Sequence, residues 1–373
     1  MRFLILTEDY STFLRRFYTQ HRGLEKRPYA EQMRMRIENL FGGPFFYSDN
    51  LKKLGHEAND VYANNEYMQK TWAREHGFQW SEDWRWGFRL RRGLVPWISR
   101  IKDQRWRYEI LAAQIRYYKP DVLLNQAMDT ISSRFLQEIK PHVGLLMGQH
   151  AAPLPPGEDY SCYDLCISSL PNLVEYFRKR GIPAEFNRLS FGPEWLASMD
   201  VAERPFDITF IGNFHSIYSS RAALLEALCS RFPQAKVWAQ DIGHLARGSS
   251  IRNCYQGQAW GREMYTIFSR SKITLNNHGD FAPYANNARL YEATGMGALL
   301  VTDWKENLHE MFEPGKEVVV YRSSDECMEL IQYYLDHKNE REAIARAGQE
   351  RTMREHIYYQ RVEELVEIVR RYL

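Results

Sequence analysis

Short apolar runs alternate along this chain with longer segments in which apolar residues recur every three or four positions. Runs of about four to eight mainly apolar residues are typical of buried strands, and the longer periodic segments are typical of amphipathic helices. In the first half, strands are predicted at Arg2–Leu6, Glu57–Tyr62, Asp121–Asn125, Val143–Met147, Leu165–Ser168 and Phe186–Leu189. The intervening helices are predicted at Tyr29–Leu40, Glu66–Glu75, Pro96–Tyr118, Ile131–Ile139 and Pro171–Arg180.

The periodicity lapses between residues 191 and 205, where Gly192-Pro193 and Arg204-Pro205 punctuate a connector. Beyond it, strands are predicted at Asp207–Gly212, Lys236–Ala239, Lys272–Asn276, Ala298–Thr302 and Glu317–Tyr321. Helices are predicted at Ser220–Arg231, Arg262–Ser269, Asn287–Thr294, Asp325–Asp336 and over Glu340–Leu373. Such alternation favours parallel sheets with helical crossovers. We therefore predict an α/β protein with two Rossmann-like domains, residues 1–200 and 205–353, that face each other across a cleft.

Composition narrows the class of protein. The 49 Lys and Arg residues nearly balance the 47 Asp and Glu residues, which argues against a dedicated nucleic-acid-binding protein. No apolar run approaches the roughly 18 residues of a membrane span, and the apolar start is too short for a secretory signal. We therefore expect a cytoplasmic protein without a transmembrane segment. The cysteines are odd in number and scattered, so we expect reduced structural thiols at Cys162, Cys166, Cys229, Cys254 and Cys327.

One segment, from Arg74 to Arg107, is unusually rich in tryptophan and arginine. The favoured interpretation is an inserted helical region, about residues 74–118, that packs its tryptophans and exposes its arginines to water. The alternative is a surface for an anionic or glycan acceptor, or for a membrane face. The tryptophans in question are Trp80, Trp84, Trp86, Trp97 and Trp106.

The turn after the strand at Asp207–Gly212 is a first candidate for anion binding. Gly212 lets the backbone approach a ligand closely, and the residues that follow, His215 among them, lead into a helix. The free N–H groups at a helix start favour an anion, and Arg221 adds donors that suit phosphate oxygens. The alternative is an ordinary tight turn with a surface arginine.

A long polar loop before the predicted helix at residue 287 is the stronger candidate. Asn286 and Asn287 stand where the loop opens on the helix, a position suited to hold a diphosphate. Arg289 in the first turn opposes the helix dipole, so its place makes more sense with an anion present. Glu292 can accept hydrogen bonds from a ribose diol. The alternative is a surface ion pair between Arg289 and Glu292, three residues apart.

At this stretch the chain resembles the spore-maturation-protein (CgeB-like) glycosyltransferases. The similarity lies in the run Asn287-x-Arg289-Leu290-x-Glu292-Ala293-x-Gly295-x-Gly297-Ala298-Leu299-Leu300-x-Thr302-Asp303. It extends to Gly261-x-Glu263-Met264-Tyr265 and to His356–Arg361, and more loosely to Gly148-Gln149-His150 in the first half. The resemblance implies a GT-B fold, with donor binding in the second domain, acceptor binding in the first, and a last helix, residues 354–373, that crosses back to the first domain.

The activity that the resemblance implies is transfer of a sugar, as in hexosyltransferases, from a nucleoside-diphosphate sugar to an acceptor. The donor base stays open between UDP, GDP and dTDP, and the acceptor and the oligomeric state are also left open. We expect neither a cofactor nor a metal ion, because Arg289 and the helix dipole would neutralise the diphosphate. Retaining relatives often carry a first glutamate eight positions before the second, and Tyr284 stands there. The stereochemical outcome is therefore open, and Asp280 is a candidate for contact with the donor sugar.

Three further positions are candidates for the reaction itself. His150 follows the strand at Val143–Met147, where side chains face the ligand cleft of an open α/β sheet. The resemblance implies a place for it near the transferred sugar, as a hydrogen-bond donor or a general base, against a purely structural role. Glu8 and Asp9 follow the first strand and are candidate acids of the acceptor site, with capping as the alternative.

Trp260 precedes the helix at Arg262–Ser269 and is a candidate to stack on the donor base, with core packing as the alternative. Two other functions stay in view. A nicotinamide oxidoreductase is disfavoured because no G-x-G-x-x-G follows a predicted strand. A two-domain nucleotide- or sugar-binding protein without catalysis is compatible with the same residues.

Overall fold

The first half of the chain is built on a six-stranded parallel sheet of order β2-β1-β5-β6-β7-β8. The structure is a computed structural model that describes residues 1–42, 44–82, 84–91, 95–102, 104–155, 157–194, 203–213, 219–285 and 287–373, with the backbone alone for Pro44, residues 84–91 and 95–102, and Ser219. The strands are β1 (Arg2–Thr7), β2 (Glu57–Tyr62), β5 (Val122–Asn125), β6 (Leu145–Gln149), β7 (Leu165–Ser168) and β8 (Ala184–Phe186).

Helices cover both faces of this sheet, which is why β1 and β5 consist almost wholly of buried apolar residues. Phe3 and Ile5 of β1 pack against one cluster of apolar side chains, and Leu4 and Leu6 pack against another. The helices are α1 (Ser11–Gln20), α2 (Tyr29–Glu38), α3 (Pro44–Lys53), α4 (Glu66–Glu75), α5 (Arg105–Tyr118), α6 (Ser133–Ile139) and α7 (Pro171–Arg178), with short 3-10 turns η1 (Leu24–Lys26) and η2 (Lys140–His142).

The second half repeats the architecture with a sheet of order β11-β10-β9-β12-β13-β14, again parallel throughout. Its strands are β9 (Phe206–Ile211), β10 (Lys236–Trp238), β11 (Tyr255–Gly257), β12 (Ser271–Leu275), β13 (Leu299–Asp303) and β14 (Val319–Tyr321). Its helices are α8 (Ser219–Arg231), α9 (Ile251–Cys254), α10 (Gly261–Ser269), α11 (Arg289–Gly295), α12 (Ser324–Asp336), α13 (Lys338–Glu355) and the 3-10 turn η5 (Leu308–Glu310).

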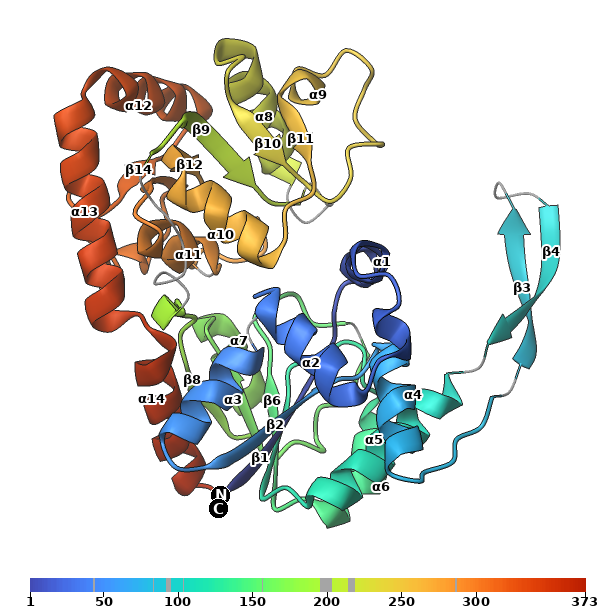
Figure 1. Ribbon diagram of the computed structural model, residues 1–373. Coiled ribbons are helices and arrows are strands. Elements are labelled where there is room, and N and C mark those ends of the chain that lie inside the picture. The colour runs from blue at the N-terminus through green and yellow to red at the C-terminus, as the bar shows by residue number, and fades with distance from the viewer. Residues whose placement is uncertain are drawn as a thin grey trace.

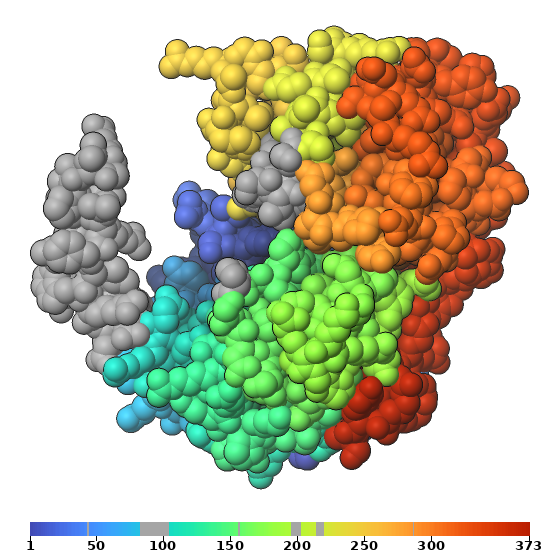
Figure 2. Space-filling model, turned by 180° about the vertical axis from the view of Figure 1, so that it is seen from behind, coloured from blue at the N-terminus to red at the C-terminus, as the bar shows by residue number. Residues whose placement is uncertain are grey.

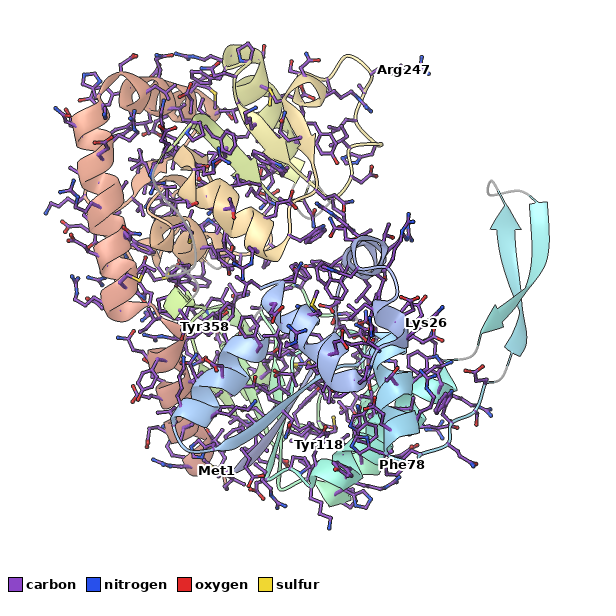
Figure 3. The ribbon with its side chains drawn as sticks, viewed as in Figure 1. Met1, Lys26, Phe78, Tyr118, Arg247 and Tyr358 are labelled. Carbon is purple, nitrogen blue, oxygen red and sulfur yellow. The ribbon has the colours of Figure 1, made fainter. Side chains whose placement is uncertain are left out.

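The last helix, α14 (Tyr358–Arg370), returns to the first half, as the resemblance implied. It packs against α3, where the rings of Phe46 and Tyr358 stack with their centroids 4.7 Å apart. Figure 2 shows this red helix lying along the green first half, and Figure 3 places Tyr358 at the junction of the two halves. The predicted α/β class with two facing Rossmann-like sheets and a returning helix is confirmed. Residues 195–202 lie outside the described residues, so the boundary near residue 200 stays a prediction.

The predicted helical insertion is wrong in part. The strands β3 (Trp84–Arg91) and β4 (Val95–Lys102) form a two-stranded antiparallel sheet, with Trp84 opposite Lys102 (Figure 1). The helix predicted from Pro96 begins only at Arg105. The run Trp-Arg-Trp-Gly-Phe-Arg-Leu-Arg alternates with a period of two, the signature of a strand, and this period outweighs the charge-rich composition that suggested a helix. A role of this segment in binding an anion, a glycan or a membrane stays a prediction.

Two composition-based expectations have a counterpart in the structure. All five cysteines are buried and free of disulfides, as expected for structural thiols. Among the residues that the structure describes, no helix combines the length and the apolar character that a bilayer span requires.

Candidate active site

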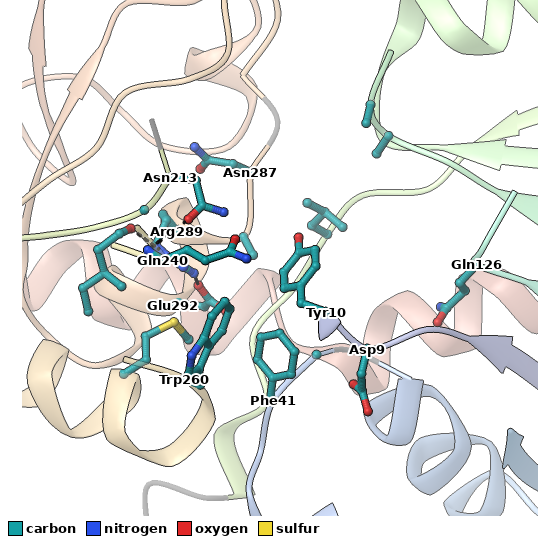
Figure 4. A pocket seen from close by; sticks show the side chains of 18 of the residues that line it. Asp9, Tyr10, Phe41, Gln126, Asn213, Gln240, Trp260, Asn287, Arg289 and Glu292 are labelled. Carbon is teal, nitrogen blue, oxygen red and sulfur yellow. Dashed lines mark hydrogen bonds and ion pairs between the residues drawn. The ribbon is translucent and has the colours of Figure 1, made fainter. Parts of the chain in front are cut away.

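A cavity of about 750 Å³ lies between the carboxyl ends of the two sheets and is lined by both halves of the chain (Figure 4). The loops after β1, β5 and β6 line it from the first half, and the loops after β9, β10 and β12 line it from the second. Ligands of open α/β sheets bind at this edge of the strands. Of the candidate residues named from the sequence, the cavity brings together Glu8, Asp9, His150, Gly212, Arg221, Trp260, Asn287, Arg289 and Glu292.

Arg289 and Glu292 stand side by side on the wall formed by the second half. Arg289 donates through Nε to the carbonyl of Ile211 at 3.0 Å and through Nη1 to Glu292. Glu292 is 8% exposed, and its other oxygen accepts a hydrogen bond from the Tyr265 hydroxyl at 3.4 Å. Burial raises the pKa of Tyr265 well above its ordinary value, so this phenol stays protonated. The ion pair weighed as an alternative is therefore present, but it lines the cavity and does not lie on the outer surface.

The polar loop before α11 is held in place by asparagine side chains. Asn287 donates to the side-chain oxygen of Asn276 at 2.8 Å and accepts from the backbone N–H of Leu290 at 3.3 Å. It thus caps the first turn, although the helix begins at Arg289, two residues later than predicted. Asn286 lies outside the described residues. Tyr284, which stands where retaining relatives have a glutamate, packs at the edge of an apolar cluster of the first half.

The turn at Gly212 also contributes to the wall of the cavity that the second half forms. A side chain at this position would place its Cβ 2.8 Å from the ring of Phe210, so the tight approach requires glycine. Arg221 is 6% exposed and donates to the backbone carbonyls of Asn213, at 2.8 Å, and of Asn277. It therefore fastens the loop after β9 to the loop after β12. His215, predicted as a donor contact, lies outside the described residues.

The carboxylate of Asp280 is hydrogen-bonded at the start of helix α8. Its carboxylate accepts hydrogen bonds from the Ser220 hydroxyl at 2.7 Å and the Ser220 backbone N–H at 3.2 Å, which caps the start of α8. Its neighbours Gly279 and Phe281 line the cavity, whereas Asp280 is not among the described lining residues. Its contact with a donor sugar stays a prediction that this geometry does not support.

On the first half, His150 faces the cavity from the end of β6. It is 9% exposed, its Nε2 atom lies 3.4 Å from the carbonyl of Pro153, and burial lowers its pKa below the ordinary value. The lowered pKa favours the neutral imidazole at pH 7, and the neutral form is the one that can act as a general base. Glu8, also at the cavity, pairs with Arg107, and burial raises its pKa despite that partner.

Asp9, in contrast, has both oxygens engaged by Arg36. Nε of Arg36 donates to one oxygen at 2.8 Å and Nη2 donates to the other, and both side chains are at most 2% exposed. Figure 4 shows Asp9 on the side of the cavity away from Arg289. A fully buried, paired carboxylate positions its loop more readily than it exchanges protons with a substrate, so a role of Asp9 as an acid is not supported by its contacts.

Trp260 connects the two halves. Its ring meets Phe41 edge-on at 4.9 Å between centroids and lies 5.7 Å from the ring of Tyr10 (Figure 4). Close by, Arg16 of α1 contacts Glu263 at 2.8 Å and the carbonyl of Gln258 at 2.6 Å. We call this set of contacts between α1, the Phe41 loop and residues 258–263 the α1 latch. Stacking of Trp260 on a base stays a prediction, while its packing in the latch is observed.

Several amide side chains that line the cavity were not predicted as site residues from the sequence. Gln149 donates to the Tyr47 hydroxyl at 2.8 Å and accepts from Gln126 at 2.7 Å, and Gln240 donates to Thr12 at 2.7 Å. The sequence does give one indication of them: they lie at or just after the ends of predicted strands, where polar side chains face the edge of the sheet that binds ligands. Among the described residues, no group of three His, Cys, Asp or Glu side chains is arranged to hold a metal ion.

Comparisons with known proteins agree with this geometry. A family model described as glycosyl transferase-like matches residues 217–367. No curated protein matches the sequence.

Solved structures match over the whole chain. A glycosyltransferase from Rickettsia africae is 9% identical with a TM-score of 0.61, and the match covers 100% of this chain and 98% of that one. Anabaena HepE, solved in complex with UDP-glucose, is 10% identical with a TM-score of 0.59, over 99% of both chains. The pneumococcal O-GlcNAc transferase GtfA, in complex with UDP and GlcNAc, is 11% identical with a TM-score of 0.55, over 100% and 99%. The chain thus has the GT-B fold of these enzymes, and its residues 217–367 are similar to a family described as glycosyl transferase-like.

Proposed function

We propose that this protein is a glycosyltransferase that moves a sugar from a nucleoside-diphosphate sugar to an acceptor bound by the first half. The observation that carries the proposal is the pair Arg289 and Glu292, set on one wall of the cavity between the two sheets. The GT-B fold and the match of residues 217–367 to a glycosyl transferase-like family support it. Within that class, the run from Asn287 to Asp303 favours the CgeB-like group and a hexosyl donor.

Arg289 is proposed to bind the diphosphate. A guanidinium has five N–H donors, and the two that contact Ile211 and Glu292 fix its orientation while others remain to donate to phosphate oxygens. Gly212 has no side chain, so the diphosphate can approach the protein backbone closely at this turn. Donors held ready in a partly buried cavity stabilise the negative charge that develops on the leaving diphosphate. We propose on this basis that neither a metal ion nor a cofactor is needed.

Glu292 is proposed to accept hydrogen bonds from the ribose hydroxyls. Its carboxylate is already oriented by Arg289 and by the protonated Tyr265, so little rearrangement is needed on binding. UDP is the donor nucleotide that we favour, because both HepE and GtfA were solved with it. His150, on the opposite wall, is proposed to lie at the transferred sugar, as a hydrogen-bond donor or as the base that takes the acceptor proton. We place the reaction in the cytoplasm.

The test is binding and turnover with the full chain. We expect UDP to raise the melting temperature more than GDP or dTDP, because a ligand that binds only the folded state stabilises it by RT ln(1 + [L]/Kd). Arg289→Ala is expected to abolish the UDP shift, and Arg134→Ala, an 88% exposed arginine far from the cavity, is expected to leave it unchanged. Release of UDP from UDP-sugars by the unaltered protein then separates an enzyme from a binding protein. An equal UDP shift in Arg289→Ala refutes the assignment of the diphosphate site.

A further inference from the structure

A second cavity, of about 600 Å³, lies entirely within the first half of the chain. It is lined by residues of α1, by the loop at residues 22–25 and by the residues 64–67 that lead from β2 into α4. None of these residues belongs to the cavity between the two sheets. Its volume falls within the range of about 300–1,000 Å³ that is usual for small-ligand sites.

The two cavities open at the same edge of the first sheet. β1 and β2 are parallel neighbours with Thr7 opposite Tyr62, so the loops that follow them leave the sheet side by side. Asn64 of the second cavity accepts from the backbone N–H of Asp9 at 3.0 Å and donates to the carbonyl of Asp9 at 2.6 Å. Asp9 itself lines the cavity between the sheets. The pair of Asp9 and Asn64 therefore connects the walls of the two cavities.

The lining of the second cavity combines an aromatic ring with charged side chains. Tyr67 is 50% exposed, and its ring lies 4.7 Å from that of Tyr18. Tyr18 is anchored by its hydroxyl, which bonds to Gln32 at 3.0 Å and to Asn65 at 2.9 Å. The exposed ring of Tyr67 therefore offers an apolar face, and the side chains of Arg15, Arg22 and Glu25 in the same lining supply hydrogen-bond donors and acceptors.

The charges of the lining are balanced. Two arginines, Arg15 and Arg22, stand against two glutamates, Glu25 and Glu66, of which Glu66 pairs with Lys70 at 3.0 Å. A neutral sugar ring, with an apolar C–H face and hydroxyls around its edge, matches an aromatic face surrounded by polar groups of both kinds.

We infer that the second cavity binds a sugar unit of a glycan acceptor whose end reaches the transfer site past the loop at residues 8–10. This inference rests on the proposed function and names the acceptor class, an oligosaccharide. Tyr67 is the residue on which the distal sugar packs. Binding therefore grows with the number of sugar units, because only a chain of several units fills both cavities.

The test uses the full chain on an array of printed glycans, from monosaccharides to hexasaccharides of mixed sugars and linkages, followed by calorimetry with the strongest binder. We expect oligosaccharides to bind and their component monosaccharides to bind at least tenfold more weakly. Tyr67→Ala is expected to weaken oligosaccharide binding at least tenfold, whereas Tyr67→Phe, which keeps the ring, restores it. Tyr359→Ala, a 38% exposed tyrosine of α14, serves as the matched control.

The UDP thermal shift is measured on the same variants and is expected to be unaltered by Tyr67→Ala. Binding of oligosaccharides no tighter than that of monosaccharides, or an unchanged affinity in Tyr67→Ala, overturns the inference. Absence of glycan binding with an intact UDP shift overturns it as well and leaves the proposed function standing. Absence of a shift with UDP, GDP and dTDP alike refutes the proposed function, and the acceptor role of this cavity with it.

Discussion

At the residue scale, Arg36 is a buried side chain in the lining of the cavity between the two sheets. Its guanidinium pairs with Asp9 and is surrounded by the rings of Phe13, Phe41 and Tyr62, at 4.8, 5.5 and 4.4 Å from their centroids. Removing one partner of such a buried pair costs about 3–5 kcal/mol, because the other charge stays buried without compensation. Arg36 thus ties α2 to the loop at residues 8–10.

Asp60, close to that pair, is expected to make the stability depend on pH. Burial raises its pKa to about 6, although the Ser48 hydroxyl donates to it at 2.6 Å. In the unfolded chain an aspartate titrates near 3.9, so the folded state binds this proton more tightly. Its contribution to stability is fully present below about pH 4 and is lost as the pH rises to about 6, by about 3 kcal/mol in all.

The measurement is the free energy of unfolding in urea between pH 4 and pH 7, for the unaltered protein and for Asp60→Asn. The stability of the unaltered protein relative to the variant should fall by about 3 kcal/mol across this range and stay level above it. Asp336→Asn, at an exposed position, is the control and should show no such slope. A difference that does not change with pH would mean that Asp60 does not titrate in this window.

At the scale of elements, the α1 latch depends on the glycine that begins α10. Gly261 has φ +50°, and a Cβ there would overlap the carbonyl oxygen of Asn39, which also accepts from the backbone N–H of Arg262 at 2.7 Å. Glycine at this position therefore permits both the left-handed conformation and the close approach of the second half to the loop after α2. The latch closes the side of the cavity opposite to α14.

Gly261→Ala is expected to destabilise the protein by about 1–3 kcal/mol and to separate the latch, because neither backbone can absorb the overlap. We expect a lower free energy of unfolding, a larger radius of gyration in X-ray scattering, and weaker UDP binding. Gly257→Ala is the matched control, since φ is +102° there but nothing lies within 4 Å of the added Cβ. If the two substitutions lowered the free energy of unfolding equally, the loss of stability would come from backbone strain alone and not from the overlap with Asn39.

At the scale of the whole molecule, α14 joins the two halves into one structure. The chain leaves α13 at His356, pairs with Phe191 in an isolated parallel bridge through Ile357, and then runs along the first half. Val362, Leu365 and Val369 are fully buried there, in the same apolar cluster as residues of both sheets. The chain thus crosses between the halves twice, once near residues 187–206 and once at residue 356.

Ending the chain after Glu355 is expected to unfold the first half and leave the second sheet folded. Each buried Leu or Val side chain contributes about 1.5–3 kcal/mol, and the sum over α14 is comparable with the whole stability of a domain, about 5–15 kcal/mol. Amide hydrogen exchange resolved by segment measures this: β1, β2 and β5 should lose protection, while β12 and β13 keep it. Removal of residues 371–373 alone should leave both protected. Retained protection in β1 would show that the first half folds without α14.

Local patterns in the sequence were enough to predict most helices and strands and part of the candidate site. The buried runs at β1, β5 and β13 and the glycine after β9 are local signals, because strand period and turn chemistry depend on neighbouring residues. The same reasoning failed over residues 96–102, where composition was read in place of the period of two that marks β4. Nothing in the sequence indicates that Ser220, sixty residues away, binds the carboxylate of Asp280, and the contact of Asp280 with a donor sugar stays a prediction.

The order of strands and helices, and the polar residues at the strand ends, were decided by the sequence itself, through periodicity that each segment carries alone. The tertiary structure alone decided the roles of those polar residues. It turned the pair of Arg289 and Glu292 into the cavity, buried Asp9 against Arg36, and set Trp260 against Phe41. Each of these outcomes depends on which distant segments of the chain are buried together. Burial and charge pairing between distant residues arise only in the folded structure, so no single segment of the sequence predicts them.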